Sequence, residues 1–115
     1  MIPKLLGPKR KYSGNGQQEA SFEEQEGGRS RVLGSLHFTT VSGLLPLGVE
    51  AIESGRATVI DLAGVNESDS SGLALLIEWL SVAKAAACSL RYDNVPTQLH
   101  QLARLSEVEE LLAAG

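Results

Sequence analysis

The sequence predicts an α/β domain with a mixed β-sheet, formed by an N-terminal hairpin and βαβ crossovers and covered by about four helices. Short strand-like segments, which are either apolar throughout or alternate between apolar and polar residues, are interspersed along the chain with segments whose apolar residues have helical spacing. A Gly-Gly pair joins the first two strand candidates, which is typical of a hairpin. Strands that are connected through helices pair in parallel, and their connections are right-handed. The predicted element order is therefore β-β-α-β-α-β-α-α.

The first half of the chain contains the hairpin, one helix and a buried strand. Residues 21–26 are a weak strand candidate, and residues 31–38 alternate as a second strand after Gly27-Gly28. Residues 41–54 have apolar side chains at helical spacing, and Pro46 places the start of this helix near residues 43–45. The next strand, residues 58–62, is short, apolar and β-branched, as expected for a strand that is buried on both faces.

The second half begins with the strongest helical pattern, over residues 70–87. A further strand is predicted over residues 89–93, and helices over residues 96–105 and 108–114. Because these helices must bury their apolar faces, at least one face of the sheet is expected to be covered.

Length and composition limit the function classes. The chain has 115 residues, of which 43% are hydrophobic and 21% charged, which suits one small globular domain rather than a multidomain enzyme. Cys88 is the one cysteine, so no disulfide framework is possible. No segment approaches the roughly 20 apolar residues of a membrane span, and no export signal is recognisable at the start. These features predict a cytoplasmic protein.

The sign of the net charge changes from positive to negative near residue 20 of the chain. Residues 1–20 hold four basic residues against one acid, whereas residues 21–115 hold six against thirteen. Residues 7–20 have little to bury, so we expect a disordered basic arm over residues 1–20 and a folded domain over residues 21–115. An acidic body argues against nucleic acid as a partner. The basic run at residues 9–11 is either a solubilising tail or a contact for phosphates or lipid headgroups.

The helix predicted over residues 70–87 carries more apolar surface than packing on one sheet requires. Two adjacent stripes together span roughly 200° of its circumference, against ~100° for a helix with one buried face. A neighbouring helix of the same chain is one explanation. A partner protein is the other, with Trp79 as its anchor, because tryptophan is enriched at binding hot spots. The stripes are Leu73, Leu76, Ile77, Leu80 and Ala83, and Leu75, Trp79, Val82 and Ala86.

This helix begins at Asp69-Ser70-Ser71-Gly72. Its first amides have no partners within the helix, and either Asp69 or Ser70 is a suitable cap. Gly72 has no side chain to cover the helix start, so another backbone or a ligand can approach closely. A phosphate on Ser70 would lie at the positive end of the helix dipole. Plain capping without regulation is the alternative.

The segments at residues 59–65 and 69–76 together resemble the signature of STAS domains, the anti-sigma-factor antagonists and their relatives. Gly34-Ser35-Leu36 and residues 90–105 strengthen the resemblance, which is greatest to MlaB-type STAS subunits of the Mla phospholipid-transport ABC system. The resemblance implies a STAS-like fold and a non-catalytic subunit without a cofactor.

By the same resemblance, the partner is the ATPase subunit of the transporter and, through it, the permease, so the chain meets the inner membrane only through the complex. Ser70 corresponds to the family's functional hydroxyl. The implied binding surface extends over the loop at residues 65–68 and the outward part of the Leu75–Trp79–Val82 stripe. Its predicted members are Asp69, Ser70, Ser71, Gly72, Leu75 and Trp79.

The alternative within the family is an anti-sigma-factor antagonist that is switched by phosphorylation of Ser70. His37 stands where many STAS domains carry an acidic residue, which disfavours this alternative more than the transporter role. A lipid- or nucleotide-binding domain is a third hypothesis, from a different class.

Enzyme signatures are missing from the sequence. His37 and His100 belong to different predicted elements, and no Cys/His spacing suits a metal. Neither a phosphate-binding P-loop nor a Gly-x-Ser-x-Gly elbow is present. Asp61 and Asp69 flank a predicted loop, where acids usually serve as turn and cap residues. The sequence therefore predicts a protein-binding module rather than an enzyme.

Overall fold

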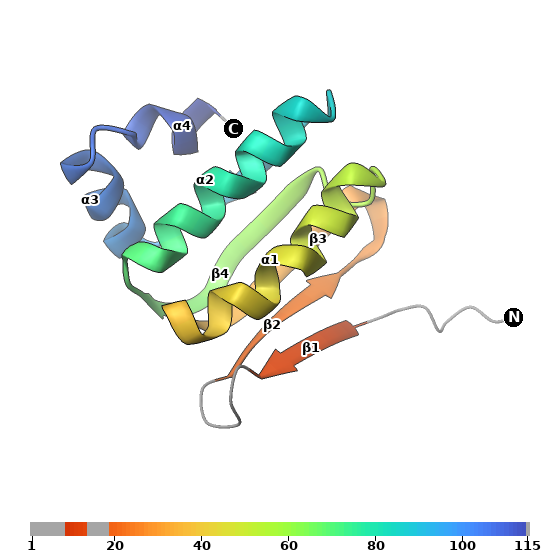
Figure 1. The fold of residues 1–115 in the computed structure, drawn as a ribbon, viewed down its shortest axis with the longest axis horizontal. Helices are drawn as coiled ribbons and strands as arrows, with labels where there is room; N and C mark the ends of the chain where they lie inside the picture. Colours follow the sequence, from red (N-terminus) through yellow and green to blue (C-terminus); the bar gives the residue numbers. More distant parts are fainter. Residues whose placement is uncertain (1–8, 14–18, 115) are drawn as a thin grey trace, which may run out of the picture.

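The computed structural model describes residues 9–13 and 19–114. They form a five-stranded sheet in the order β1-β2-β3-β4-β5, with α1 and α2 across one face and α3 and α4 beside α2 (Figure 1). The predicted α/β class is confirmed. No helix in these two ranges is long and apolar enough to span a bilayer. The elements are β1 Lys9–Ser13, β2 Glu19–Glu24, β3 Arg29–Leu36, α1 Phe38–Glu53, β4 Val59–Ser68, α2 Ser70–Ala85, β5 Arg91–Asp93, α3 Thr97–Leu105 and α4 Glu109–Ala114.

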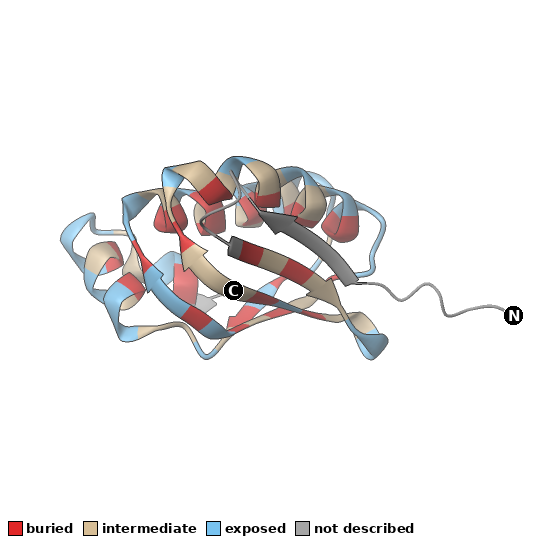
Figure 2. Ribbon diagram, turned by 90° about the horizontal axis from the view of Figure 1, so that it is seen from below, coloured by how far each residue is buried: buried red, intermediate tan, exposed pale blue. Residues whose placement is uncertain are grey.

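The sheet is mixed, as predicted. Strands β1, β2 and β3 pair antiparallel, whereas β3, β4 and β5 pair parallel. Gly27 and Gly28 connect β2 to β3 with φ angles of 76° and 80°, which glycine adopts without steric cost. Buried residues lie on the helix side of the sheet, and no α-helix of the described residues covers the opposite side (Figure 2).

The expected disordered arm is wrong for part of its length. Lys9–Ser13 forms β1, and Glu19 and Ala20 belong to β2, so the folded unit starts before residue 21. Composition misses such a strand because its stability comes from backbone hydrogen bonds to a neighbour, and a polar edge strand needs few apolar side chains. The rest of the predicted arm, residues 1–8 and 14–18, lies outside the described residues.

Helix α1 starts at Phe38, whereas the predicted start was near residues 43–45. The His37 N–H donates to Thr40 Oγ1 at 3.0 Å, and Thr40 Oγ1 donates to the Ser35 carbonyl at 2.9 Å. Thr40 thereby satisfies a free amide at the helix start and anchors the first turn to β3. Pro46 consequently lies inside the helix rather than in its first turn.

Strand β4 is longer than predicted. It continues through residues 65–68, which were expected to form a loop, and stays paired with β3 up to Leu36–Ser68. Two register shifts interrupt the pairing, and β-bulges of this kind obscure the alternating pattern from which strands are predicted.

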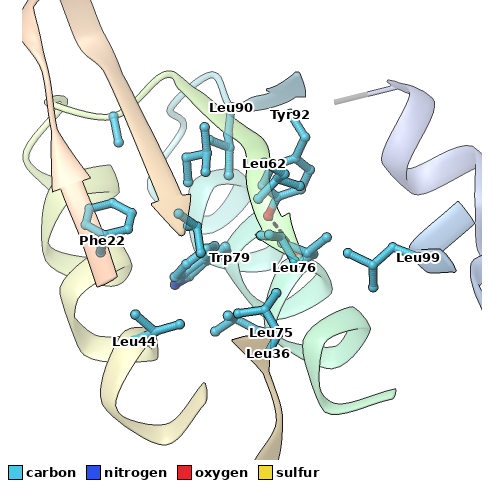
Figure 3. Close-up of a cluster of buried hydrophobic side chains, with 14 of the residues drawn as sticks. Phe22, Leu36, Leu44, Leu62, Leu75, Leu76, Trp79, Leu90, Tyr92 and Leu99 are labelled. Atoms are coloured by element: carbon cyan, nitrogen blue, oxygen red, sulfur yellow. Dashed lines mark hydrogen bonds between the residues drawn. The ribbon is translucent and has the colours of Figure 1, made fainter. Parts of the chain in front are cut away.

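The Trp79 side chain is the largest fully buried one and joins α2 to α1. Its indole N–H donates to the Leu45 carbonyl at 3.1 Å, and its ring packs edge-to-face against Phe22, with centroids 5.7 Å apart (Figure 3). Gly48 lies directly against the indole, where a Cβ atom would overlap it. A helix of the same chain therefore covers Trp79 in the second apolar stripe, as the first of the two explanations predicts, whereas Ala86 at the end of that stripe is exposed.

We expect Gly48→Ala to lower the free energy of unfolding by about 1–3 kcal/mol, because the added methyl overpacks the indole contact. Urea denaturation followed by the fluorescence of Trp79, the one tryptophan, measures the change. Ser42→Ala alters an exposed position of the same helix and should stay within about 0.5 kcal/mol of wild type. Equal stability of the two variants would contradict this packing.

Charges on the open face of the sheet pair with one another. Asp61 and Asp93 lie opposite each other on adjacent strands, which is unfavourable for like charges unless a cation is shared. Arg29 supplies that cation, 3.3 Å from the Asp61 carboxylate and 3.0 Å from that of Asp93. Arg31 and Glu23 form a further pair on the same face at 2.9 Å.

These contacts lower the pKa values of both aspartates. Hydrogen bonds from Asn94 and the Ala63 N–H, together with Arg29, lower the pKa of Asp61. A hydrogen bond from Arg29 is the main reason why the pKa of Asp93 is lowered. Each carboxylate therefore stabilises the fold at pH values above its ordinary pKa of about 4, and the contribution disappears as the pH falls through the lowered pKa.

We expect Arg29→Met to reduce stability at pH 7 and to flatten the decline of stability below about pH 4, because the pKa of Asp93 returns toward its ordinary value. Melting curves at pH values from 7 down to 2 test this. Arg31→Met removes an arginine from the same face whose ion pair is with Glu23 rather than with either aspartate, and should keep the acid-induced decline of wild type. An unchanged pH dependence in Arg29→Met would contradict the assignment.

Candidate functional site

The candidate site lies at the edge of the sheet where β3 and β4 end. Because these strands are parallel, their last residues, Leu36 and Ser68, are register partners, and α1 and α2 start immediately after them. The two helix N-termini therefore lie side by side (Figure 1). His37 lies between them, with Nε2 3.7 Å from the Glu67 carboxylate and Nδ1 3.9 Å from that of Asp69.

Asp69 is the N-cap of α2. Its carboxylate accepts a hydrogen bond from the Ser71 N–H at 2.7 Å, and its own N–H donates to the Leu36 carbonyl at 3.0 Å. Of the two capping candidates, the structure thus selects Asp69. Ser70, the first residue of the helix, is exposed. Its hydroxyl is accessible at the positive end of the α2 dipole.

A groove opens between α1 and α2 next to Ser70. It encloses about 380 Å³, and Ser71 connects it to the α2 N-terminus. Leu75, which is only 4% exposed, contributes to the groove as well as to the core. The groove is mainly apolar and is lined by Val41, Ser42, Leu45, Ser71, Ala74, Leu75 and Glu78.

Two of the predicted site residues are buried in the monomer and pack against other parts of the same chain. Trp79 is fully buried and cannot anchor a partner, so the prediction of an outward-facing tryptophan is wrong. Gly72 is buried as well, and a Cβ atom there would overlap Ser68 Oγ and press on Leu36. The absent side chain therefore lets α2 approach β3 and β4, rather than giving a ligand access to the helix start.

The α1 side of the groove was missed by the sequence analysis. Phe38, Val41 and Leu45 recur at spacings of three and four residues, which places them on one face of α1. Phe38 is 69% exposed, which is unusual for a large apolar side chain. It extends this apolar line toward the N-terminal ends of α1 and α2, where Ser70 lies. The spacing alone was a usable signal, but the predicted helix start at residues 43–45 had left Phe38 outside the helix.

The remaining candidates lie apart from the groove. His100 is on α3 and Cys88 follows α2, and neither lines the groove. Within the described residues, no cluster of three or more His, Cys, Asp or Glu side chains could hold a metal ion.

Comparison with known families assigns the fold. The family model described as "Mlab, STAS domain" matches residues 23–113, most of the chain. This chain belongs to the MlaB-type STAS domain family. The resemblance seen in the sequence is thereby confirmed, and the chain is a member of a family of regulatory and accessory protein-interaction modules. No curated protein sequence matches it significantly.

Two solved structures of the anti-sigma-factor antagonist SpoIIAA have the same fold. The phosphorylated form from Bacillus matches with a TM-score of 0.58 and 19% identity, over 77% of this STAS chain and 86% of that chain. The unphosphorylated form matches with a TM-score of 0.61 and 20% identity, over 77% and 83%. At this identity the similarity establishes the shared architecture, and the function must be argued from the site.

We expect Asp69→Ala to lower the free energy of unfolding by about 1 kcal/mol, because the Ser71 amide loses its cap. Ser70→Ala leaves that cap intact and should change stability by less than about 0.5 kcal/mol, a smaller cost than if Ser70 were the cap. Asp69→Asn keeps an acceptor at the cap and should recover most of the loss. Chemical denaturation compares the three variants, and equal losses in Asp69→Ala and Ser70→Ala would contradict the assignment.

Proposed function

We propose that this STAS domain is a non-catalytic accessory subunit that binds the ATPase of an Mla-type ABC transporter. Through that complex it supports phospholipid transport between membranes and the lipid asymmetry of the outer membrane. Membership of the MlaB-type family supports this role. In this proposal the chain is cytoplasmic and reaches the inner membrane, and the permease, only through the ATPase.

The observation that carries the proposal is the exposed Ser70 beside an apolar groove. Ser70 and Ser71 begin α2, and the groove extends from Ser71 along both helices. Small residues at the rim, including Ala74, leave the apolar floor open to an incoming side chain. Exposed apolar surface next to polar groups is typical of a protein-binding site.

A phosphorylation-switched antagonist of an anti-sigma factor is the second candidate. It is favoured by the likeness to SpoIIAA, which has been solved in phosphorylated and unphosphorylated forms, and by the exposure of the Ser70 hydroxyl. A phosphate there would face the amides of the α2 N-terminus, while Glu67 and Asp69 would repel it. Affinity purification from the native host separates the candidates: an ABC ATPase supports the first, a sigma-regulating kinase the second.

We expect Ser70→Arg to abolish the complex with the transporter ATPase and to leave the fold intact, since the large side chain blocks the α2 N-terminus while position 70 is exposed. Co-expression of the two subunits followed by size-exclusion chromatography measures complex formation. Ser81→Arg is the matched control, an exposed position of the same helix about 16 Å away, and should keep the complex. Full binding by Ser70→Arg, or no complex with the wild-type domain, would overturn the proposed function.

A further inference from the structure

The chemistry of the groove between α1 and α2 identifies the kind of partner segment that fits it. Phe38, Val41 and Leu45 form the apolar line on α1, and Leu75 contributes apolar surface from α2. An occupant must therefore supply at least one large apolar side chain. A volume of about 380 Å³ is small for a whole helix and suits a few inserted side chains.

Acidic side chains surround this apolar surface. Glu78 lines the groove, and Glu67 and Asp69 lie at the α2 N-terminus with side chains that are 61% and 50% exposed. Within residues 19–114, these three carboxylates have no ion pair with lysine or arginine, and the basic side chain beside Glu67 and Asp69 is that of His37. The negative charge at this edge is thus available to another molecule.

The arginines of residues 19–114 are all engaged elsewhere. Each of the five forms an ion pair with an acid outside the groove. The pairs are Arg29 with Asp61 and Asp93, Arg31 with Glu23, Arg56 with Glu24 and Glu50, Arg91 with Asp93, and Arg104 with Glu109. None of these five arginines therefore neutralises an acid of the groove.

Pro46 adds a hydrogen-bond acceptor to the same place. Proline has no N–H, so the carbonyl of Ser42, four residues earlier, lacks its usual helical donor. Ser42 lines the groove. A donor on an incoming segment would satisfy this carbonyl.

We propose that the groove binds a basic amphipathic segment of the partner protein, with apolar side chains on Leu45 and Leu75 and lysine or arginine facing Glu78 and the Glu67–Asp69 end. This inference rests on the proposed function, because it assigns the chemistry of the partner at that same site. Asp69 and Glu78 are nine residues apart on one helix, about 13 Å. The basic groups of the partner should therefore lie about 13 Å apart as well.

Other occupants fit less well. Anionic membranes and nucleic acids would be repelled by the unpaired carboxylates. A second copy of this chain that docked through the same surface would place like charges opposite each other. Binding of any of these occupants in the groove would contradict the proposal.

The test is an NMR titration of the isotope-labelled domain with two short synthetic peptides. Both carry leucines at helical spacing, one with lysine and one with glutamate at every polar position. We expect the lysine peptide to shift the amide signals of residues 38–45 and 70–78, with an affinity that falls as salt is added. The glutamate peptide should leave them unchanged. Equal binding of both peptides, shifts that map outside the groove, or absence of binding would overturn the inference.

Charge-reversal variants sharpen the test. Glu78→Lys should weaken binding of the lysine peptide about fivefold or more, because an attraction becomes a repulsion. Glu26→Lys makes the same change in net charge in the β2–β3 connection, at the opposite end of β3 from the groove, and should bind like wild type. Equal affinities of these two variants would overturn the inference.

Failure of this inference differs from failure of the proposed function. If the ATPase binds the wild-type domain but not Ser70→Arg, while Glu78→Lys binds the ATPase as tightly as wild type, the site is correct and the basic partner segment is wrong. If the lysine peptide binds as expected but the ATPase does not, the preference of the groove for a basic segment is correct and the transporter role is wrong.

Discussion

The parallel pairing of β3 with β4 is the constraint on which the rest of the structure depends. Each of these strands feeds directly into a helix, so the pairing brings the starts of α1 and α2 to one edge of the sheet. Hydrogen bonds at the strand ends lock this arrangement: the Asp69 N–H donates to the Leu36 carbonyl, and Thr40 donates to that of Ser35. A shift of one residue between the strands would separate Ser70 from the groove it adjoins and turn buried side chains outward.

Packing and the binding that we propose involve different sides of the same two helices. Trp79 fills the space between α1 and α2 on the sheet side, where Gly48 makes room for its indole. On the outer side, small residues such as Ser71 and Ala74 leave the groove unfilled. Charge shows a similar division within residues 19–114, since Arg29 and Arg31 pair with acids of the sheet while Glu78 has no ion pair. Substitutions can therefore change binding without unfolding the domain.

Much of this architecture was predictable from local patterns. Period-two and helical spacing identified β2, β3, α1, the buried part of β4, and α2, and the family signature located Ser70 at the start of α2. The N-cap role of Asp69 follows from its residue type and its place before an apolar helix. These features depend on near neighbours in the chain, and near-neighbour chemistry is what a single sequence displays.

The remaining features come from contacts between distant segments. Strand β1 exists because β2 offers it a backbone edge, which no apolar pattern signals. Trp79 and Val82 share one predicted stripe, yet Trp79 is fully buried and Val82 only partly, because α1 covers the tryptophan. The helix pattern shows how much apolar surface must be covered, but a neighbouring helix and a partner protein satisfy that requirement equally well. Which of them does so is fixed by the packing of α1 on α2, because burial depends on separation in space rather than along the chain.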